Sequence, residues 1–209
     1  MSLSLSNNST LLIFQKNIVL GQAKTRIAAT VGDEKALEIY QKLIAYTHTT
    51  VSALPMEKYL YFSEVVEQEY VGPNQFHLTV QKGLDLGERM ANAFQNAFDA
   101  GYSRVILIGT DCGELSSEIL EKAFECLNSA DLVLGPAKDG GYYLIGMTGP
   151  HSELFSDMEW STADVLERTL EKAQRIKLEF KLLPLLSDVD TYSDWMQQKN
   201  HVESVLKQG

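Results

Sequence analysis

The chain has 209 residues, of which 18 are basic and 28 acidic, so its formal net charge at pH 7 is -10. This length allows one domain with a substantial core, and we expect a single domain over residues 1–209 with a flexible segment at 1–10. The excess of acidic residues argues against binding to nucleic acid or to anionic membrane surfaces.

The two cysteines, Cys112 and Cys126, have no histidine or cysteine around them at metal-ligand spacing. This argues against a zinc site and a disulfide framework. The start, MSLSLSNNST, lacks the charged and apolar regions of a signal peptide, and no window approaches the roughly 18 apolar residues of a membrane span. We therefore expect a cytoplasmic protein with free thiols.

The spacing of apolar residues predicts strands that alternate with amphipathic helices. In chain order we expect a strand at 11–14, a basic loop at 15–26, a helix at 33–53, strands at 59–62 and 76–80, a helix at 86–100, a strand at 105–108, a helix at 117–128, strands at 131–135 and 142–146, a helix at 162–174, a strand at 180–184 and a helix at 191–206. This order predicts an α/β fold, a three-layer α/β/α sandwich with a mostly parallel central sheet.

The apolar strand at 105–108 ends abruptly in Gly109-Thr110-Asp111. Such a run is typical of a strand buried on both faces, and ligands of open α/β sheets bind beyond the carboxyl ends of these strands. Asp111 is therefore a candidate to bind a divalent cation or a ligand hydroxyl. Alternatively it caps the next helix, although Ser116 and Ser117 are better candidates for that role.

The segment GQAKTR follows the first predicted strand and places Lys24 and Arg26 on either side of a threonine. Backbone amides and two cations at such a position can bind a phosphate. The segment is not a P-loop, because Ala23 and Ile18 stand where that motif requires glycines. Alternatively, Lys24 and Arg26 form a solvated surface pair.

Asp85 and Glu88 have the spacing of a helix capping box. Gly87 lowers helix stability in the first turn, which capping leaves unexplained and which the close approach of a ligand would explain. Arg89 would then point toward the same end of the sheet.

Asp139 is followed by Gly140 and Gly141 between two predicted strands. Asp-Gly is an ordinary hairpin turn signal, but four glycines around one aspartate also suggest a backbone that passes close to something bulky. Asp139 is thus a second candidate acid.

Asp188-Val189-Asp190 follows the last predicted strand. These carboxylates could complete a cation site with Asp111, whereas Thr191 and Asp194 have the spacing of a helix cap. Cys112 has no histidine near it in the sequence, which favours a buried thiol over a nucleophile.

The ordered motifs GQAKTR, DLGERM, GTDC, GPAKDGGYYLIG, WST and DVDT resemble those of the glycosyltransferase-A-like family of arsenosugar-biosynthesis or radical-SAM-associated transferases. This family belongs to the nucleotide-diphospho-sugar transferase superfamily, and the resemblance spans about residues 11 to 195. More distant relatives, the guanylyltransferases of molybdenum-cofactor and deazaflavin-cofactor synthesis, share the fold but transfer a nucleotidyl group.

The resemblance implies a role for each motif. The residues that would face the nucleotide and its phosphates are Gly21, Lys24, Thr25, Arg26, Gly87, Glu88 and Arg89. Asp111 would hold Mg²⁺ or Mn²⁺ with Asp190, while Asp139, Gly140 and Gly141 would border the acceptor or sugar pocket, with Asp139 as a candidate base. The family usually has proline where this chain has Leu20 and Gly113, which predicts a looser backbone at the site.

We therefore expect a metal-dependent transferase that moves a glycosyl group from a nucleoside diphosphate sugar to a small-molecule acceptor. One alternative is a nucleotidyltransferase that releases pyrophosphate. Another is a non-catalytic protein that binds nucleotide sugars.

Overall fold

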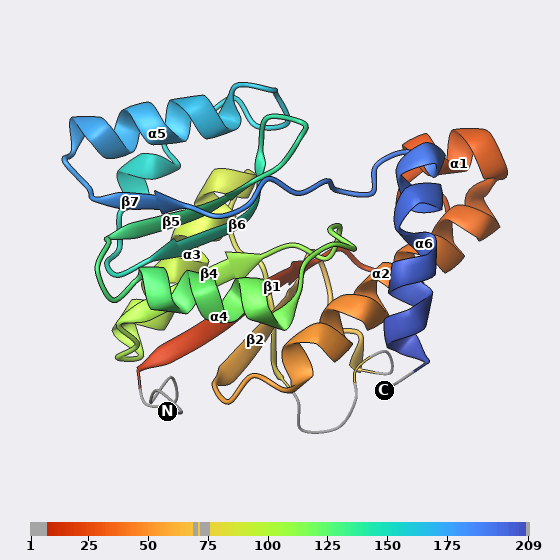
Figure 1. Cartoon of the computed structure of the whole chain (residues 1–209), viewed down its shortest axis with the longest axis horizontal. Helices are drawn as coiled ribbons and strands as arrows, with labels where there is room; N and C mark the ends of the chain where they lie inside the picture. Colours follow the sequence, from red (N-terminus) through yellow and green to blue (C-terminus); the bar gives the residue numbers. More distant parts are fainter. Residues whose placement is uncertain (1–7, 69–70, 72–75, 208–209) are drawn as a thin grey trace.

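The computed structural model describes residues 8–68, 71 and 76–207. Its centre is a seven-stranded sheet in the order β3-β2-β1-β4-β6-β5-β7 (Figure 1). The strands are β1 (Ser9–Gln15), β2 (Glu57–Phe62), β3 (His77–Val80), β4 (Arg104–Ile108), β5 (Leu132–Pro136), β6 (Tyr142–Met147) and β7 (Phe180–Leu182). Strand β6 runs antiparallel to β4 and β5, and the other neighbours pair in parallel. The predicted mostly parallel sheet is confirmed.

Helices cover both faces of this sheet. They are α1 (Thr25–Val31), α2 (Asp33–Ser52), α3 (Leu86–Asp99), α4 (Ser117–Cys126), α5 (Val165–Arg175) and α6 (Tyr192–Leu206), with a short 3-10 helix at Ser152–Leu154. Helices α3 and α5 pack on one face, and α2 and α4 on the other. Helices α1 and α6 pack against α2. The three-layer α/β/α sandwich is confirmed.

Strand β1 illustrates how the sequence builds these layers. Leu11 and Ile13 point into the core beneath α2 and α4, whereas Leu12 and Phe14 point into the core beneath α3. Because both faces are buried, the four consecutive positions 11–14 are apolar instead of every second one. Burial of each such side chain contributes about 1.5–3 kcal/mol, so the central strands are firmly fixed and can position the loops that follow them.

The amino-terminal boundary differs from the sequence prediction. Strand β1 begins at Ser9, and both Ser9 and Thr10 are fully buried. The Thr10 hydroxyl donates a hydrogen bond to the Glu57 carbonyl, which explains how a polar residue fits inside the sheet. The rest of the segment predicted to be flexible, residues 1–7, lies outside the described residues.

Two helices also differ from the prediction. The seven-residue α1 lies within and just after the predicted basic loop, and its Ile27 is fully buried against α2 and α6. Helix α5 begins at Val165, three residues after the predicted start. Asp164 occupies the N-cap position of this helix, so residues 162–164 precede its first turn.

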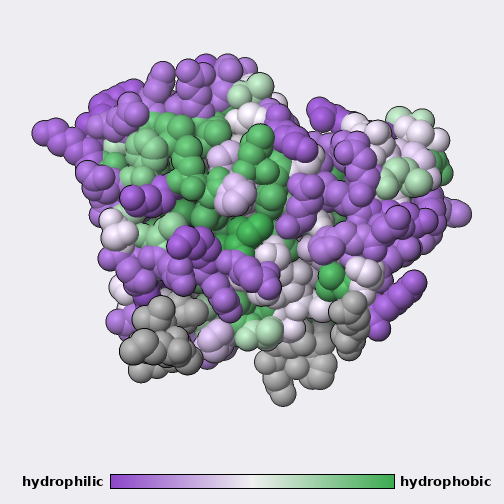
Figure 2. All heavy atoms as spheres, viewed as in Figure 1, coloured by the Kyte–Doolittle hydropathy of each residue, from purple (hydrophilic) through white to green (hydrophobic). Residues whose placement is uncertain are grey.

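Figure 2 shows apolar side chains gathered over β5, β6 and β7, between the more polar surfaces of α4 and α5. Leu182 is 50% exposed and Leu185 is 58% exposed in this part of the chain. Among the described residues, no helix is both long and apolar enough to cross a membrane.

Candidate functional site

A cleft opens beyond the carboxyl ends of β1 and β4. It has two adjacent chambers of about 500 Å³ and about 420 Å³. Asp111, Asp139 and Asp190 line both chambers. Ligands of α/β sheets bind in this position, and the volumes are in the range of small-molecule sites. The placement of Asp111 just beyond the end of β4 agrees with the sequence prediction.

Lys24 lies between two of these carboxylates. Its Nζ is 2.8 Å from Asp111 Oδ1 and 3.7 Å from Asp190 Oδ1, and it donates a hydrogen bond of 2.7 Å to the Val189 carbonyl. The Lys24 side chain is 6% exposed, whereas those of Asp111 and Asp190 are each 40% exposed. The ammonium is therefore buried behind carboxylates that remain open to the cleft.

The two cations of the GQAKTR segment are thus not equivalent. The interpretation of a solvated surface pair is wrong for Lys24 but suits Arg26, whose side chain is 77% exposed and whose Nη1 is 3.6 Å from Asp190 Oδ2. Lys24, Thr25 and Arg26 line the smaller chamber, while Gly21 lies outside both. Gly21 has φ 78°, a turn conformation that favours glycine. Phosphate binding by this segment stays a prediction.

Three segments that are distant in sequence meet at Lys24. Lys24 itself has a left-handed backbone with φ 53°, a conformation that costs a residue other than glycine about 1 kcal/mol. The buried contacts of its ammonium offset this cost. The Val189 amide donates a hydrogen bond of 2.8 Å to the Asp111 carbonyl, so the chain after β7 runs directly beside the end of β4.

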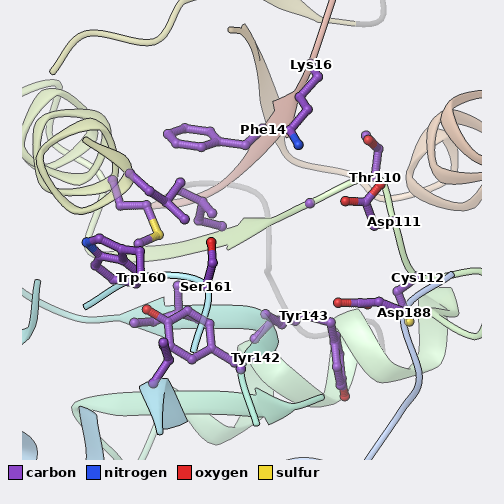
Figure 3. Close-up of a pocket in the computed structure, with 18 of the residues that line it drawn as sticks. Phe14, Lys16, Thr110, Asp111, Cys112, Tyr142, Tyr143, Trp160, Ser161 and Asp188 are labelled. Carbon is purple, nitrogen blue, oxygen red and sulfur yellow. The ribbon is translucent and has the colours of Figure 1, made fainter. Parts of the chain in front are cut away.

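Asp188 and Cys112 lie beside Asp111 at this end of the cleft (Figure 3). Burial, together with the negative charges of Asp111 and Asp139, raises the pKa of Asp188 to about 7. Burial also raises the pKa of the Cys112 thiol to about 12, and its Sγ lies 3.7 Å from the Ser187 carbonyl. A thiol that stays protonated is a poor nucleophile, which agrees with the prediction of a buried thiol.

The opposite wall of the larger chamber is apolar. It is built from Phe14, Met90, Tyr142 and Trp160. Figure 3 shows Tyr142 and Trp160 on the far side of the chamber from Asp111 and Asp188. One cleft therefore joins an aromatic wall to a wall of carboxylates that surround the Lys24 ammonium.

The DLGE motif contributes to the aromatic wall in a way that the sequence did not reveal. A side chain at Gly87 would place its Cβ 2.8 Å from Trp160 Nε1 and 2.8 Å from the Phe155 carbonyl oxygen. Gly87 therefore lets the Trp160 indole pack against α3. The bulky group that approaches this glycine is Trp160.

Glu88 and Arg89 face different surroundings. The Glu88 amide donates to Asp85 Oδ1, which confirms Asp85 as the helix cap. The exposed Glu88 side chain accepts from the Leu84 amide instead of the Asp85 amide, so the predicted capping box is only half formed. Arg89 lines the larger chamber, and its Nε donates to the Gly83 carbonyl. Of the three residues Gly87 to Arg89, only Arg89 reaches the cleft; a nucleotide contact stays a prediction.

The loop around Asp139 is shaped by its glycines. The Gly141 amide donates a hydrogen bond of 2.9 Å to Asp139 Oδ1, which is a local turn. Gly140 has φ 92°, and a Cβ there would lie 2.0 Å from the Ala163 carbonyl oxygen. The loop thus packs directly on the segment after Trp160. Asp139 and Gly141 line the cleft while Gly140 faces Ala163, and their roles toward a substrate stay predictions.

The two positions without the family proline differ in their surroundings. A Cβ at Gly113 would lie 2.7 Å from Gln198 Oε1 and 2.8 Å from Val202 Cγ2, so α6 fills the space that a larger residue would need. Leu20 is 56% exposed. Gly113 is therefore enclosed by packing.

The end of α6 that faces the cleft carries a complete capping box. The Asp194 amide donates to the Thr191 hydroxyl, and the Thr191 amide donates to the Asp194 carboxylate. This confirms the capping interpretation for that pair. Asp190 precedes the cap and faces the cleft.

The residues that could hold a metal form a pair. Within residues 8–68, 71 and 76–207, no three histidine, cysteine, aspartate or glutamate side chains are grouped to hold a metal ion. Asp111 and Asp190 still offer hard carboxylate oxygens that are open to the cleft. Because Mg²⁺ is usually held by one or two carboxylates plus substrate phosphates, this pair fits a divalent cation whose coordination a nucleotide completes.

Two cleft residues were missed by the sequence analysis. Lys16 follows β1 directly and lines both chambers, and its carbonyl accepts a hydrogen bond from Tyr40 Oη. Figure 3 shows its side chain extending into the cleft. Its position at the end of an apolar strand was the available signal. Trp160 belongs to the WST motif, but it was given no role, because it lies in a loop far from any central strand end.

Comparisons with known proteins agree with this architecture. Residues 45–162 match a family described as uncharacterized proteins conserved in bacteria, DUF2064. A proposed nucleotide-diphospho-sugar transferase from Desulfovibrio desulfuricans G20 is 32% identical, with a TM-score of 0.84 over 97% of this chain and 98% of that one. No curated protein matches the chain.

Two more distant structures share the fold alone. The inositol-1-phosphate CTP transferase from T. maritima is 15% identical, with a TM-score of 0.66 over 98% of both chains. A manganese complex of Rv0371c from Mycobacterium tuberculosis H37Rv is 8% identical, with a TM-score of 0.54 over 92% of this chain and 98% of that one. The predicted nucleotide-diphospho-sugar transferase fold is confirmed.

Proposed function

The chain belongs to the DUF2064 family, and from this premise we propose that it is a metal-dependent transferase that moves a glycosyl group from a nucleoside diphosphate sugar to a small-molecule acceptor. The observation that carries the proposal is the meeting of Lys24 with Asp111 and Asp190 in a cleft beyond β1 and β4. The similarity to the protein from Desulfovibrio desulfuricans supports the same class of donor.

The smaller chamber is suited to a departing diphosphate. Lys16, Lys24 and Arg26 line it, and their positive charges would stabilise the negative charge that develops as the sugar leaves. A divalent cation on Asp111 and Asp190 would supply Lewis-acid stabilisation of the same leaving group when bound.

The larger chamber is suited to the rest of the substrate. Aromatic side chains on its far wall can pack against a base or a sugar ring. Asp139 lines both chambers, so it is our candidate to hold an acceptor hydroxyl and accept its proton. A cytoplasmic location stays a prediction.

A second candidate is nucleotidyl transfer, in which an acceptor attacks the α-phosphate of a nucleoside triphosphate. It is favoured by the shared fold of the inositol-1-phosphate CTP transferase. The same three cations would stabilise a departing pyrophosphate. A non-catalytic protein that binds nucleotide sugars would use the same cleft.

Product analysis tests the proposal. The purified protein is incubated with nucleoside diphosphate sugars or nucleoside triphosphates, a panel of small hydroxyl acceptors, and Mg²⁺, Mn²⁺ or EDTA. Release of a nucleoside diphosphate supports glycosyl transfer, whereas release of pyrophosphate supports nucleotidyl transfer. Binding without either product across the acceptors would favour the non-catalytic alternative.

Thermal shift identifies the donor to assay. A ligand at a hundred times its Kd stabilises the native state by about 2.7 kcal/mol. For a chain of this size, each kcal/mol raises Tm by roughly 2–4 °C. We expect a metal-dependent rise in Tm of about 5–10 °C for the correct nucleotide sugar.

A further inference from the structure

We infer that Lys24 is a built-in cation that a divalent metal must displace from Asp111 and Asp190, so that the metal binds tightly only once nucleotide phosphates attract the Lys24 ammonium. This inference rests on the proposed function, and it concerns the order in which that site is filled. It predicts that removing the Lys24 charge strengthens metal binding, the opposite of what a merely structural lysine would do.

The first support is the position of the ammonium. Lys24 Nζ lies 2.8 Å from Asp111 Oδ1 and 3.7 Å from Asp190 Oδ1, the two carboxylates that would hold a metal. A Mg²⁺ ion binds oxygen at about 2.0–2.1 Å. An ammonium and a divalent ion on the same oxygens would lie only a few ångströms apart and repel each other strongly.

The second support is that the ammonium is already well satisfied. Besides the two carboxylates, it donates a hydrogen bond to the Val189 carbonyl, and its side chain is 6% exposed. Arg26, by contrast, is 77% exposed and lies 3.6 Å from Asp190. Lys24 is therefore the group that competes with a metal, while Arg26 is free to meet an anion from solution.

The third support is a nearby alternative for the displaced ammonium. Lys24 also lines the smaller chamber with Lys16, Thr25 and Arg26, where the proposed diphosphate would bind. A lysine side chain is a flexible stem with a compact charge, so it can exchange a carboxylate for a phosphate by rotation of its side-chain bonds. Because binding free energies couple reciprocally, the diphosphate would strengthen metal binding as much as the metal strengthens diphosphate binding.

The test measures Mn²⁺ binding alone, by electron paramagnetic resonance of the free ion during titration of the full chain. Lys24→Gln removes the charge and keeps a donor for the Val189 carbonyl. Lys42→Gln is the matched control, because Lys42 bridges Glu38 and Glu203 on α2 and α6, outside the cleft. We expect Lys24→Gln to lower the Kd for Mn²⁺ at least tenfold and Lys42→Gln to leave it unchanged.

Three results would overturn the inference. The first is equal Mn²⁺ affinity in the wild type and Lys24→Gln, and the second is weaker Mn²⁺ affinity in Lys24→Gln. The third is an equal gain in Mn²⁺ affinity in Lys24→Gln and Lys42→Gln. A gain shared with Lys42→Gln would reflect net charge alone. Failure of the proposed transferase is seen separately, as the absence of nucleoside diphosphate and pyrophosphate with every donor, and it would not erase a tenfold gain in metal affinity.

A second measurement uses the wild-type protein, in case Lys24→Gln does not fold. Crystals soaked in manganese chloride, with or without inorganic pyrophosphate, are examined by anomalous scattering. With pyrophosphate we expect a manganese peak about 2 Å from an oxygen of Asp111, with Lys24 Nζ moved away from that carboxylate, and without pyrophosphate a weaker peak or none. A peak beside an unmoved Lys24, an equally strong peak without pyrophosphate, or no peak at Asp111 and Asp190 with pyrophosphate would overturn the inference.

Discussion

The two walls of the cleft are held in place by different means. The charged wall is fixed by contacts of Lys24 with Asp111 and the Val189 carbonyl, which join three distant segments. The aromatic wall is fixed by close packing that depends on Gly87 and Gly140. Ion pairs and hydrogen bonds therefore position the charged wall. The aromatic wall has its shape because Gly87 and Gly140 carry no side chain and let other groups pack closely against them. Substitutions should separate these two roles.

The largest expected effect is on the charged wall. Asp111→Asn keeps the shape of the side chain but removes the charge that faces the cleft, so we expect turnover to fall at least a thousandfold, or about 4 kcal/mol in activation free energy. The measurement is kcat with the donor found by thermal shift.

Asp85→Asn is the matched control for this change. It removes one carboxylate from an exposed helix cap, where asparagine caps as well as aspartate, so it should retain activity. Full turnover by Asp111→Asn would mean that the Asp111 charge takes no part in the reaction and that the charged wall has a structural role.

The next effect is on the aromatic wall. In Gly140→Ala the new methyl group would overlap the Ala163 carbonyl at a backbone φ of 92°. Conformational strain and overpacking together should lower the free energy of unfolding by about 2–4 kcal/mol. Urea denaturation measures this loss.

Gly101→Ala separates the two causes. Gly101 also has a positive φ, of 94°, but a Cβ there would meet no atom within 4 Å. This variant should therefore show the conformational strain alone, about 1 kcal/mol. Equal losses in the two variants would mean that the Asp139 loop does not depend on packing against Ala163.

The same contrast explains how much the sequence could reveal. The charged wall was predictable because Asp111 lies three residues after the apolar run 105–108, and such runs end at the ligand-binding edge of a parallel sheet. What the sequence could not show is that Lys24 enters the space between Asp111 and Asp190. That contact depends on the turn at Lys24 and on the seven-residue α1, which is too short to give a clear periodic signal.

The aromatic wall was hidden for a different reason. Gly87 and Gly140 were recognised as unusual, but the groups that approach them, Trp160 and Ala163, come from a distant loop. A glycine in the sequence can indicate that another group packs closely against the backbone, but it does not identify that group. Gly113 is similar, since the missing proline was interpreted as a looser backbone and the structure places Gln198 and Val202 against it.

A third effect concerns the support shared by both walls. His48 on α2 lies 3.0 Å from Gln15 Oε1, and Gln15 separates Phe14 on the aromatic wall from Lys16 on the charged one. Burial lowers the pKa of His48 from 6.5 to about 4. Below pH 6.5 the unfolded chain takes up a proton that the native state excludes. The contribution of His48 to stability is therefore complete above pH 6.5 and is lost as the pH falls to 4.

This loss should amount to about 3 kcal/mol between pH 6.5 and pH 4. His48→Gln cannot take up the proton, so its stability should fall less steeply over that range. Urea denaturation at several pH values compares the two slopes, and carboxylate titration is common to both proteins. Parallel slopes would mean that His48 is not the acid-sensitive part of the support.

The smallest expected effect is on Trp160. This indole lines the larger chamber across from Asp111 and Asp188, and it packs against Gly87 and Phe155. Trp160→Leu should raise the KM for the donor or acceptor about tenfold, or about 1.4 kcal/mol, with little change in kcat, because it removes packing that the ground state and the transition state share. Trp160→Phe keeps an aromatic ring, so its KM should rise about twofold or less. A fall in kcat at constant KM would mean instead that the aromatic wall positions the reacting groups, and the two walls would then act together in the chemistry.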